Sequence, residues 1–170
     1  MEIRTLEKII NFDISKKAAL CTQVEWRGSV PRKDYPMMLV DSSKNIIGTI
    51  GGGELEHTAI NLAQDIIKTG NLVLKTFDLT NEDVNKSESI CGGSTTILIE
   101  PYSKEIRELF KSILTDKSNI TNVLITKISS QNCIAVERTK ITKYFNLDLP
   151  KKIVRVIDDV IGLKTSKSIN

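Results

Sequence analysis

Apolar residues recur at helical spacing in some segments and form short continuous runs in others, which predicts a chain of mixed helices and strands. In the first half this pattern predicts a helix over 3–12, a buried central strand over 18–24, a hairpin of strands 37–40 and 46–50, and a helix over 54–68. The last of these helices is the best defined. Its first turn carries two glutamates, its last turn carries Lys68, and Gly70 follows as a stop signal.

The second half of the chain continues the same mixture. It is predicted to contain strands at 72–79 and 95–100, a helix at 104–114, a hairpin of 123–128 and 133–137, and either a helix or a strand at 153–161. Strands and helices do not alternate strictly, and no repeat or linker divides the chain. The predicted fold class is therefore α+β, a single domain with a mixed β-sheet flanked by helices.

Length, composition and charge narrow the class of protein. The 170 residues are 40% hydrophobic and 26% charged, as expected for one packed domain, which we place at 1–163 with a frayed tail at 164–170. The net charge of +3 is spread along the chain, so no nucleic-acid partner is predicted. No apolar run approaches the length of a membrane span, and the charged N-terminus is unlike a signal peptide. These features predict a cytoplasmic protein without a membrane partner.

Cysteine and histidine offer little material for a metal site. Cys21, Cys91 and Cys133 are too far apart in sequence for a C-x-x-C pair, and His57 is the single histidine. Cys21 and Cys133 lie within apolar strands, where a buried small side chain is expected. Cys91 differs, because it precedes two glycines at a loop end, where amides could stabilise a thiolate. We predict no metal ligands and no hydrolytic triad.

Three glycine-rich segments adjoin predicted strands in a chain otherwise poor in glycine, and we expect them to converge at one edge. They are Gly28-Ser29, Gly51-Gly52-Gly53, and Gly92-Gly93 after Cys91. The middle segment precedes a helix, so its amides could cradle a phosphate, although a tight turn would also explain it. Glu54 and Glu56 at the same helix end would repel an anion, and one of them could cap the helix instead. Arg32 could pair with a phosphate or carboxylate.

A rival interpretation takes 46–78 as one dinucleotide-binding βαβ unit. Asp78 falls at the distance from the glycines that suits a residue binding ribose. However, Glu56 stands where the third glycine of that fingerprint is required, and no second unit follows. This alternative would make the protein an oxidoreductase, while Cys91 offers a second enzymatic alternative, a thiol enzyme acting on a phosphorylated ligand.

Taken together, several segments resemble the XdhC/CoxI family of xanthine dehydrogenase accessory proteins in order and spacing. They are Gly28–Arg32, Met38–Val40, Gly48–Gly53 with Leu55-Glu56, and Cys91–Gly93 with Glu100-Pro101. The resemblance implies an accessory protein, not an enzyme, that binds the molybdenum cofactor (molybdopterin) as cargo. Such a chaperone holds the cofactor while an oxo ligand is exchanged for sulfur and delivers it to a molybdenum hydroxylase such as xanthine dehydrogenase. The predicted cofactor-binding residues are Ser29, Arg32, Gly51, Gly52, Gly53, Glu56, Cys91, Gly92 and Gly93.

The chain departs from the family pattern in two places. Family members commonly have glycine in the loop where this chain has Lys33–Pro36, and many have cysteine where it has Glu54. Many relatives also continue into a C-terminal Rossmann domain, which is not expected here because no further Gly-x-Gly-x-x-Gly occurs. The implied partners are the hydroxylase apo-enzyme, a sulfurtransferase, a separate Rossmann-domain subunit, and a second copy of the chain in a homodimer.

Overall fold

The computed structural model describes residues 3–79, 92–114, 120–129, 135–144 and 154–159. Cys91, Cys133, the loop 80–88 and the tail 164–170 lie outside the described residues. The chain forms two compact units, Met1–Phe110 and Lys111–Asn170, which are described separately.

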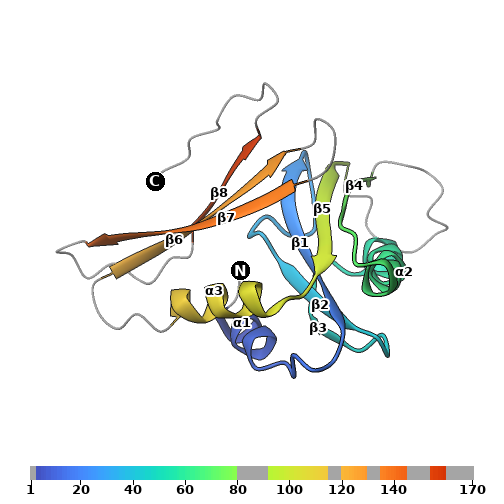
Figure 1. The fold of residues 1–170 in the computed structure, drawn as a ribbon. Coiled ribbons are helices and arrows are strands. Elements are labelled where there is room, and N and C mark those ends of the chain that lie inside the picture. Colours follow the sequence, from blue (N-terminus) through green and yellow to red (C-terminus); the bar gives the residue numbers. More distant parts are fainter. Residues whose placement is uncertain (1–2, 80–91, 115–119, 130–134, 145–153, 160–170) are drawn as a thin grey trace. The chain divides into compact units, whose positions relative to one another are not determined.

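The first unit is built on a five-stranded sheet (Figure 1). Its strands are β1 (Ala18–Arg27), β2 (Met37–Asp41), β3 (Ile46–Gly48), β4 (Val73–Asp78) and β5 (Ser94–Pro101). Their order is β3-β2-β1-β5-β4, and every neighbouring pair is antiparallel. The apolar run of β1 is buried from Ala18 to Val24 because this strand is central, as the sequence predicted.

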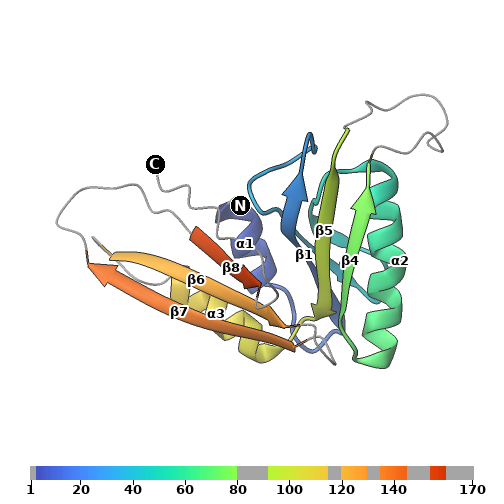
Figure 2. The ribbon, with the colours of Figure 1, turned by 90° about the horizontal axis from the view of Figure 1, so that it is seen from above.

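Helices α1 (Ile3–Ile10) and α2 (Gly53–Thr69) lie on opposite faces of this sheet (Figure 2). The apolar stripe of α2, including Leu55, Ala59 and Ala63, packs against Cys21 and Ile99 of the sheet. The helix ends at Gly70, whose left-handed backbone lets its amide donate to the Ile66 carbonyl.

Helix α3 (Lys104–Leu114) follows β5, and side chains beside and within it fix the end of α1. The Tyr102 hydroxyl donates to the carbonyl of Ile9 at 2.9 Å, and Arg107 Nε donates to the carbonyl of Ile10 at 2.8 Å. These bonds satisfy C-terminal carbonyl groups of α1, which have no partner within the helix. No helix among the described residues is both long and apolar enough to cross a membrane.

The second unit contains a three-stranded sheet of order β7-β6-β8. Strand β6 (Ile120–Ser129) pairs antiparallel with β7 (Ala135–Tyr144) and parallel with β8 (Val154–Asp159). The segment predicted as either helix or strand at 153–161 is therefore a strand. The predicted second strand of the hairpin, 133–137, is found later in the chain and is longer.

The α+β class is confirmed, and only the smaller of the two sheets is mixed. The dinucleotide-binding interpretation is wrong. It requires that the strands before and after α2 be parallel neighbours. Instead β3 and β4 occupy opposite edges of the antiparallel sheet, separated by three strands. Asp78 at the end of β4 therefore has no place in a βαβ unit.

Candidate cofactor site

The three glycine segments meet around one loop, residues 28–36, which connects β1 to β2. Gly28 and Gly93 pack backbone against backbone. A Cβ atom at Gly93 would lie 2.3 Å from the carbonyl oxygens of both Arg27 and Ser29, and one at Gly28 would lie 2.9 Å from the Gly92 oxygen. Such distances leave no room for a side chain, so glycine is required here by close approach.

The third glycine segment approaches the same loop through Pro31. A Cβ atom at Gly51 would lie 3.4 Å from Pro31 Cβ. The loop therefore touches Gly92-Gly93 near one end and Gly51 near its middle, and the expected convergence is confirmed. We call the contact between Gly28-Ser29 and Gly92-Gly93 the glycine junction. Ser29 and Gly92 are exposed there, while Arg32 is partly buried.

The amides around Gly51 and Gly52 bind an anionic oxygen that the chain itself supplies. Glu56 Oε1 accepts hydrogen bonds from the amides of Ile50, Gly51 and Gly52 at 2.9, 3.3 and 3.0 Å. The Thr49 hydroxyl donates to the same oxygen. The segment is thus an amide nest at the start of a helix, as the sequence suggested, but an external phosphate would have to displace Glu56.

The hydrogen bonds control the ionisation of Glu56. Burial raises the pKa of this carboxyl, but the bonds from Thr49 and from the amides of Gly52, Ile50 and Gly51 outweigh burial and hold the pKa below its usual value. Glu56 therefore stays a carboxylate at neutral pH. The sequence left open which of Glu54 and Glu56 caps the helix, and Glu56 has that role. Glu54 is exposed and accepts a local hydrogen bond from the Thr58 hydroxyl.

Arg32 has an acidic neighbour on its own loop. Its Nε lies 3.7 Å from Asp34 Oδ1, and about a third of its side chain is exposed. This pair spans two residues, so the guanidinium is held close to the loop without being buried in the core. A phosphate or carboxylate could compete with Asp34 for it, because an exposed ion pair contributes little to stability.

A buried glutamine of β1 fixes the 28–36 loop by hydrogen bonds to its backbone. Gln23, 1% exposed, donates from Nε2 to the carbonyl of Arg32 and to Thr95 Oγ1, both at 3.0 Å. Its backbone amide donates to the carbonyl of Pro36 at 3.1 Å. None of the described residues donates to Oε1 of Gln23. Sequence reasoning missed this residue, although a polar pair, Thr22-Gln23, inside an apolar run was the signal that could have identified it.

Two other features of the site limit its chemistry. Burial raises the pKa of the Cys21 thiol to about 12, with Glu56 and Glu100 adding to the rise, so this cysteine is a neutral core side chain as predicted.

Next to the glycine junction, the described residues form an open depression of about 250 Å³. It is lined by Arg27, Gly28, Asp78, Gly92, Gly93 and Ser94. The depression is smaller than most sites for a whole cofactor.

The sequence model of the XdhC and CoxI family matches residues 15–78 of this chain, a segment that includes the glycine-lined loop. The fold is also similar to that of a crystal structure from Bacillus halodurans described as a xanthine dehydrogenase, with a TM-score of 0.65 and 25% identity. The similarity covers 82% of this chain and 41% of that one, so the chain spans less than half the length of that protein. No curated protein matches the sequence.

The predicted resemblance to the XdhC/CoxI family is therefore confirmed. The matched residues include the Gly28–Arg32 loop, the Gly51–Gly53 nest and Glu56, but they end before Gly92-Gly93. Gly92-Gly93 joins the site through its backbone contacts with Gly28 and Ser29.

Proposed function

We propose that this chain binds the molybdenum cofactor and takes part in its delivery to a molybdenum hydroxylase, as an accessory protein without catalytic residues of its own. The family match and the likeness to a protein described as a xanthine dehydrogenase support a role in molybdenum enzyme maturation. The observation that carries the proposal is the convergence of three glycine segments on the loop that bears Arg32.

The chemistry of the cargo suits this junction. The cofactor carries a terminal phosphate, which Arg32 would pair with in place of Asp34. Ser29 and Gly92 are exposed and present backbone and hydroxyl groups without bulky side chains, which would allow the cofactor to approach closely. The Gly51–Gly53 nest, filled by Glu56, would serve mainly to shape the loop, unless the phosphate displaces that carboxylate.

The first test is an anaerobic titration of the purified protein with molybdenum cofactor, with NAD in parallel. Bound ligand is followed by absorbance and gel filtration. We expect stoichiometric binding of the cofactor and none of NAD, since β3 and β4, the strands on either side of α2, are not parallel neighbours. Binding of NAD alone would overturn the proposal in favour of a dinucleotide protein.

Variants then assign the contacts. Arg32→Ala should weaken cofactor binding by about tenfold, because a charge-assisted bond to phosphate is lost. Lys33→Ala removes one positive charge from the adjacent exposed position and is the matched control. An equal effect of both variants would show that only net charge matters.

Cys91 lies outside the described residues, but its place before Gly92-Gly93 in the sequence keeps it a candidate ligand of molybdenum or sulfur. Cys91→Ala should reduce cofactor retention and leave the folding transition unchanged, whereas retention equal to wild type would exclude Cys91 from the mechanism. Delivery is tested by the activation of an apo-hydroxylase. Cofactor binding without any transfer would mean that the chain stores the cofactor and does not deliver it.

A further inference from the structure

Tyr35 in the 28–36 loop adopts a backbone conformation that tyrosine rarely takes. Its φ is +52°, in the left-handed region. A glycine at this position would adopt the same φ without strain. A bulky residue kept in this region has a cost that surrounding structure must offset, and such strain is most often found at functional sites.

The surrounding structure holds Tyr35 from both sides. Gln23 binds the carbonyl of Arg32 through its side chain and the carbonyl of Pro36 through its backbone amide. One residue of the central strand thus fixes the chain before and after Tyr35. The strained conformation is therefore imposed by a buried clamp and is not a chance state of an exposed turn.

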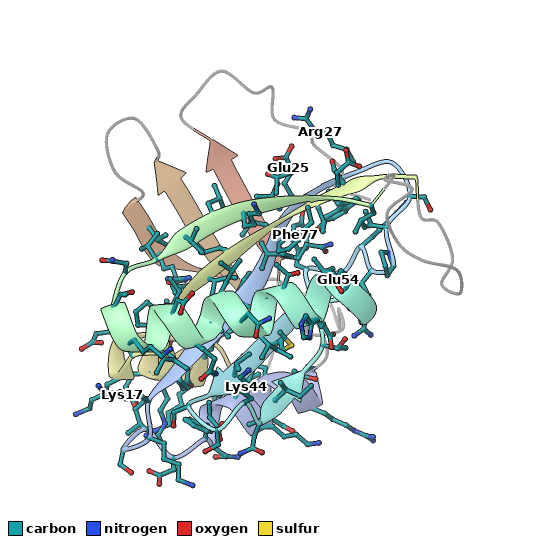
Figure 3. The ribbon with its side chains drawn as sticks, turned by 90° about the vertical axis from the view of Figure 1, so that its right-hand side faces the viewer. Lys17, Glu25, Arg27, Lys44, Glu54 and Phe77 are labelled. Carbon is teal, nitrogen blue, oxygen red and sulfur yellow. The ribbon has the colours of Figure 1, made fainter. Side chains whose placement is uncertain are left out.

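The clamp places the Tyr35 ring against Trp26. The two ring centroids lie 4.8 Å apart, with the planes inclined by 68°, and both residues are partly exposed. Figure 3 shows Glu25 and Arg27 on the side of the sheet away from α2. Because side chains alternate along a strand, Trp26 between them points to the α2 side.

The same side of the sheet carries the cross-strand neighbours of Trp26, whereas Arg27, Ser94 and Asp78, which line the depression, lie on the other side. Trp26 pairs with Thr95, which pairs with Phe77 on the next strand, and Phe77 packs against the core beneath α2. Arg32 lies three residues before Tyr35 in the clamped loop. Tyr35 and Arg32 thus share one short loop, and Trp26 lies at the end of β1 that leads into it, at the end of the sheet that bears the glycine junction.

We propose that Trp26 and Tyr35 form an aromatic platform that stacks on a planar nitrogen-heteroaromatic ring of the ligand, while Arg32 binds the ligand's anionic end. Aromatic side chains bind such rings through their faces with little dependence on ring identity. The inference rests on the proposed function insofar as the ring is the pterin of the molybdenum cofactor. An adenine ring has the same stacking chemistry, and the test separates the two.

Trp26 is the chain's single tryptophan, so its fluorescence reports directly on the platform. The probes are 6-hydroxymethylpterin, AMP and inorganic phosphate, with emission corrected for absorption by the probe and affinities confirmed by equilibrium dialysis. We expect the pterin to quench Trp26, AMP to do so more weakly, and phosphate alone to have no effect. Quenching by AMP in preference to the pterin would overturn the pterin assignment. No response to either ring would overturn the platform itself.

Three variants of Tyr35 separate stacking from a structural role. Tyr35→Leu keeps a large side chain but no ring, and Tyr35→Gly also relieves the strain. Both should weaken pterin binding by about fivefold or more, the lower end of what stacking on one aromatic contributes. Tyr35→Phe should restore wild-type affinity. Full affinity in the leucine and glycine variants would overturn the proposal, whatever their thermal stability.

The matched control is Lys44→Gly. Lys44 also has a positive φ, +64°, but it lies in the turn between β2 and β3, and the substitution relieves comparable strain there. It should leave the affinity for the pterin unchanged. If wild type binds the pterin but not the molybdenum cofactor, the proposed function fails and the platform stands. If the cofactor binds equally to wild type and Tyr35→Leu, the platform fails and the function stands.

Discussion

The two glycine regions that hold the 28–36 loop use glycine for different physical reasons. At Gly28 and Gly93 the absent side chains let two backbones approach, because a Cβ atom at Gly93 would overlap the carbonyl oxygens of Arg27 and Ser29. At Gly51 and Gly52 the backbone turns its amides towards one point, where Glu56 Oε1 accepts them. In the first region glycine is required because there is no space for a side chain. In the second region the glycine backbone lets several amides bind one negatively charged oxygen.

This difference teaches which glycine motif in the chain offers a binding surface. The amide nest is already filled by a carboxylate, so it stabilises the start of α2 and the loop beside it. The Gly28–Gly93 contact leaves Gly92 exposed at the surface, with nothing within 4 Å of the position a Cβ would take. The Gly51–Gly53 nest has the better-known phosphate-binding pattern, but its amides already donate to Glu56, so the glycine surface for a ligand lies at Gly92.

The largest effect is expected at the backbone contact. Gly93→Ala should destabilise the fold by about 3 kcal/mol or more, because its Cβ would meet backbone atoms that cannot move aside. Gly92→Ala is the matched control and should change the free energy of unfolding by less than about 1 kcal/mol. Urea unfolding measures both. Similar values for the two variants would mean that Gly93 is not in close contact with the backbone of Arg27 and Ser29.

The next largest effect is expected at the nest. Glu56→Ala should cost about 2 kcal/mol, because the amides of Ile50, Gly51 and Gly52 lose a charged acceptor. Glu54→Ala removes a carboxylate from the same helical turn, but this side chain is exposed, so the cost should be below about 1 kcal/mol. Equal losses in urea unfolding would assign the effect to the helix dipole and not to the nest.

The charge in the nest also predicts a dependence on pH. The pKa of Glu56 in the folded protein lies below its usual value of 4.5. Its ionisation therefore stabilises the fold fully above that value, and this contribution is lost as the pH falls through the lower, folded pKa.

The stability difference between wild type and Glu56→Gln should accordingly shrink between pH 5 and the acid limit of folding, roughly pH 3. Comparison with this variant removes the contributions of Asp13 and Asp41, whose pKa values are also lowered by local hydrogen bonds. A constant difference across this range would show that Glu56 is not the group responsible.

The sequence predicted most elements of the first unit because their signals are local. Apolar spacing located α2 and α3, and the glycine after α2 marked its end. The pairing of strands, in contrast, depends on residues far apart in the sequence. The similarity of 46–78 to a βαβ unit was misleading because sequence spacing does not show that α2 crosses the whole sheet to place β4 at the far edge.

The candidate site was predictable where it depends on backbone and missed where it depends on tertiary contacts. Glycine clustering correctly indicated that the three segments converge. The polar pair Thr22-Gln23 inside an apolar run marked Gln23 as unusual, but the sequence did not indicate its partner, the Arg32 carbonyl nine positions away. It also did not indicate that Tyr35 would take a left-handed conformation. Both follow from the way the loop folds back over β1, which no periodicity encodes.

The smallest predicted effect concerns the group that neither glycine region supplies, a cation for the ligand. Arg32 pairs with Asp34 at 3.7 Å, so a bound anion must compete with that carboxylate. Asp34→Asn should therefore strengthen binding of the proposed phosphate-bearing cofactor by about 1.4- to fivefold, which corresponds to the 0.2–1 kcal/mol typical of an exposed ion pair. The gain should diminish at high salt. Asp65→Asn breaks the exposed pair with Lys68 near the C-terminal end of α2 and makes the same change in net charge. An identical gain in that control would mean that Arg32 acts through the overall field, and a loss of affinity in Asp34→Asn would mean that Asp34 positions Arg32 and does not compete for it.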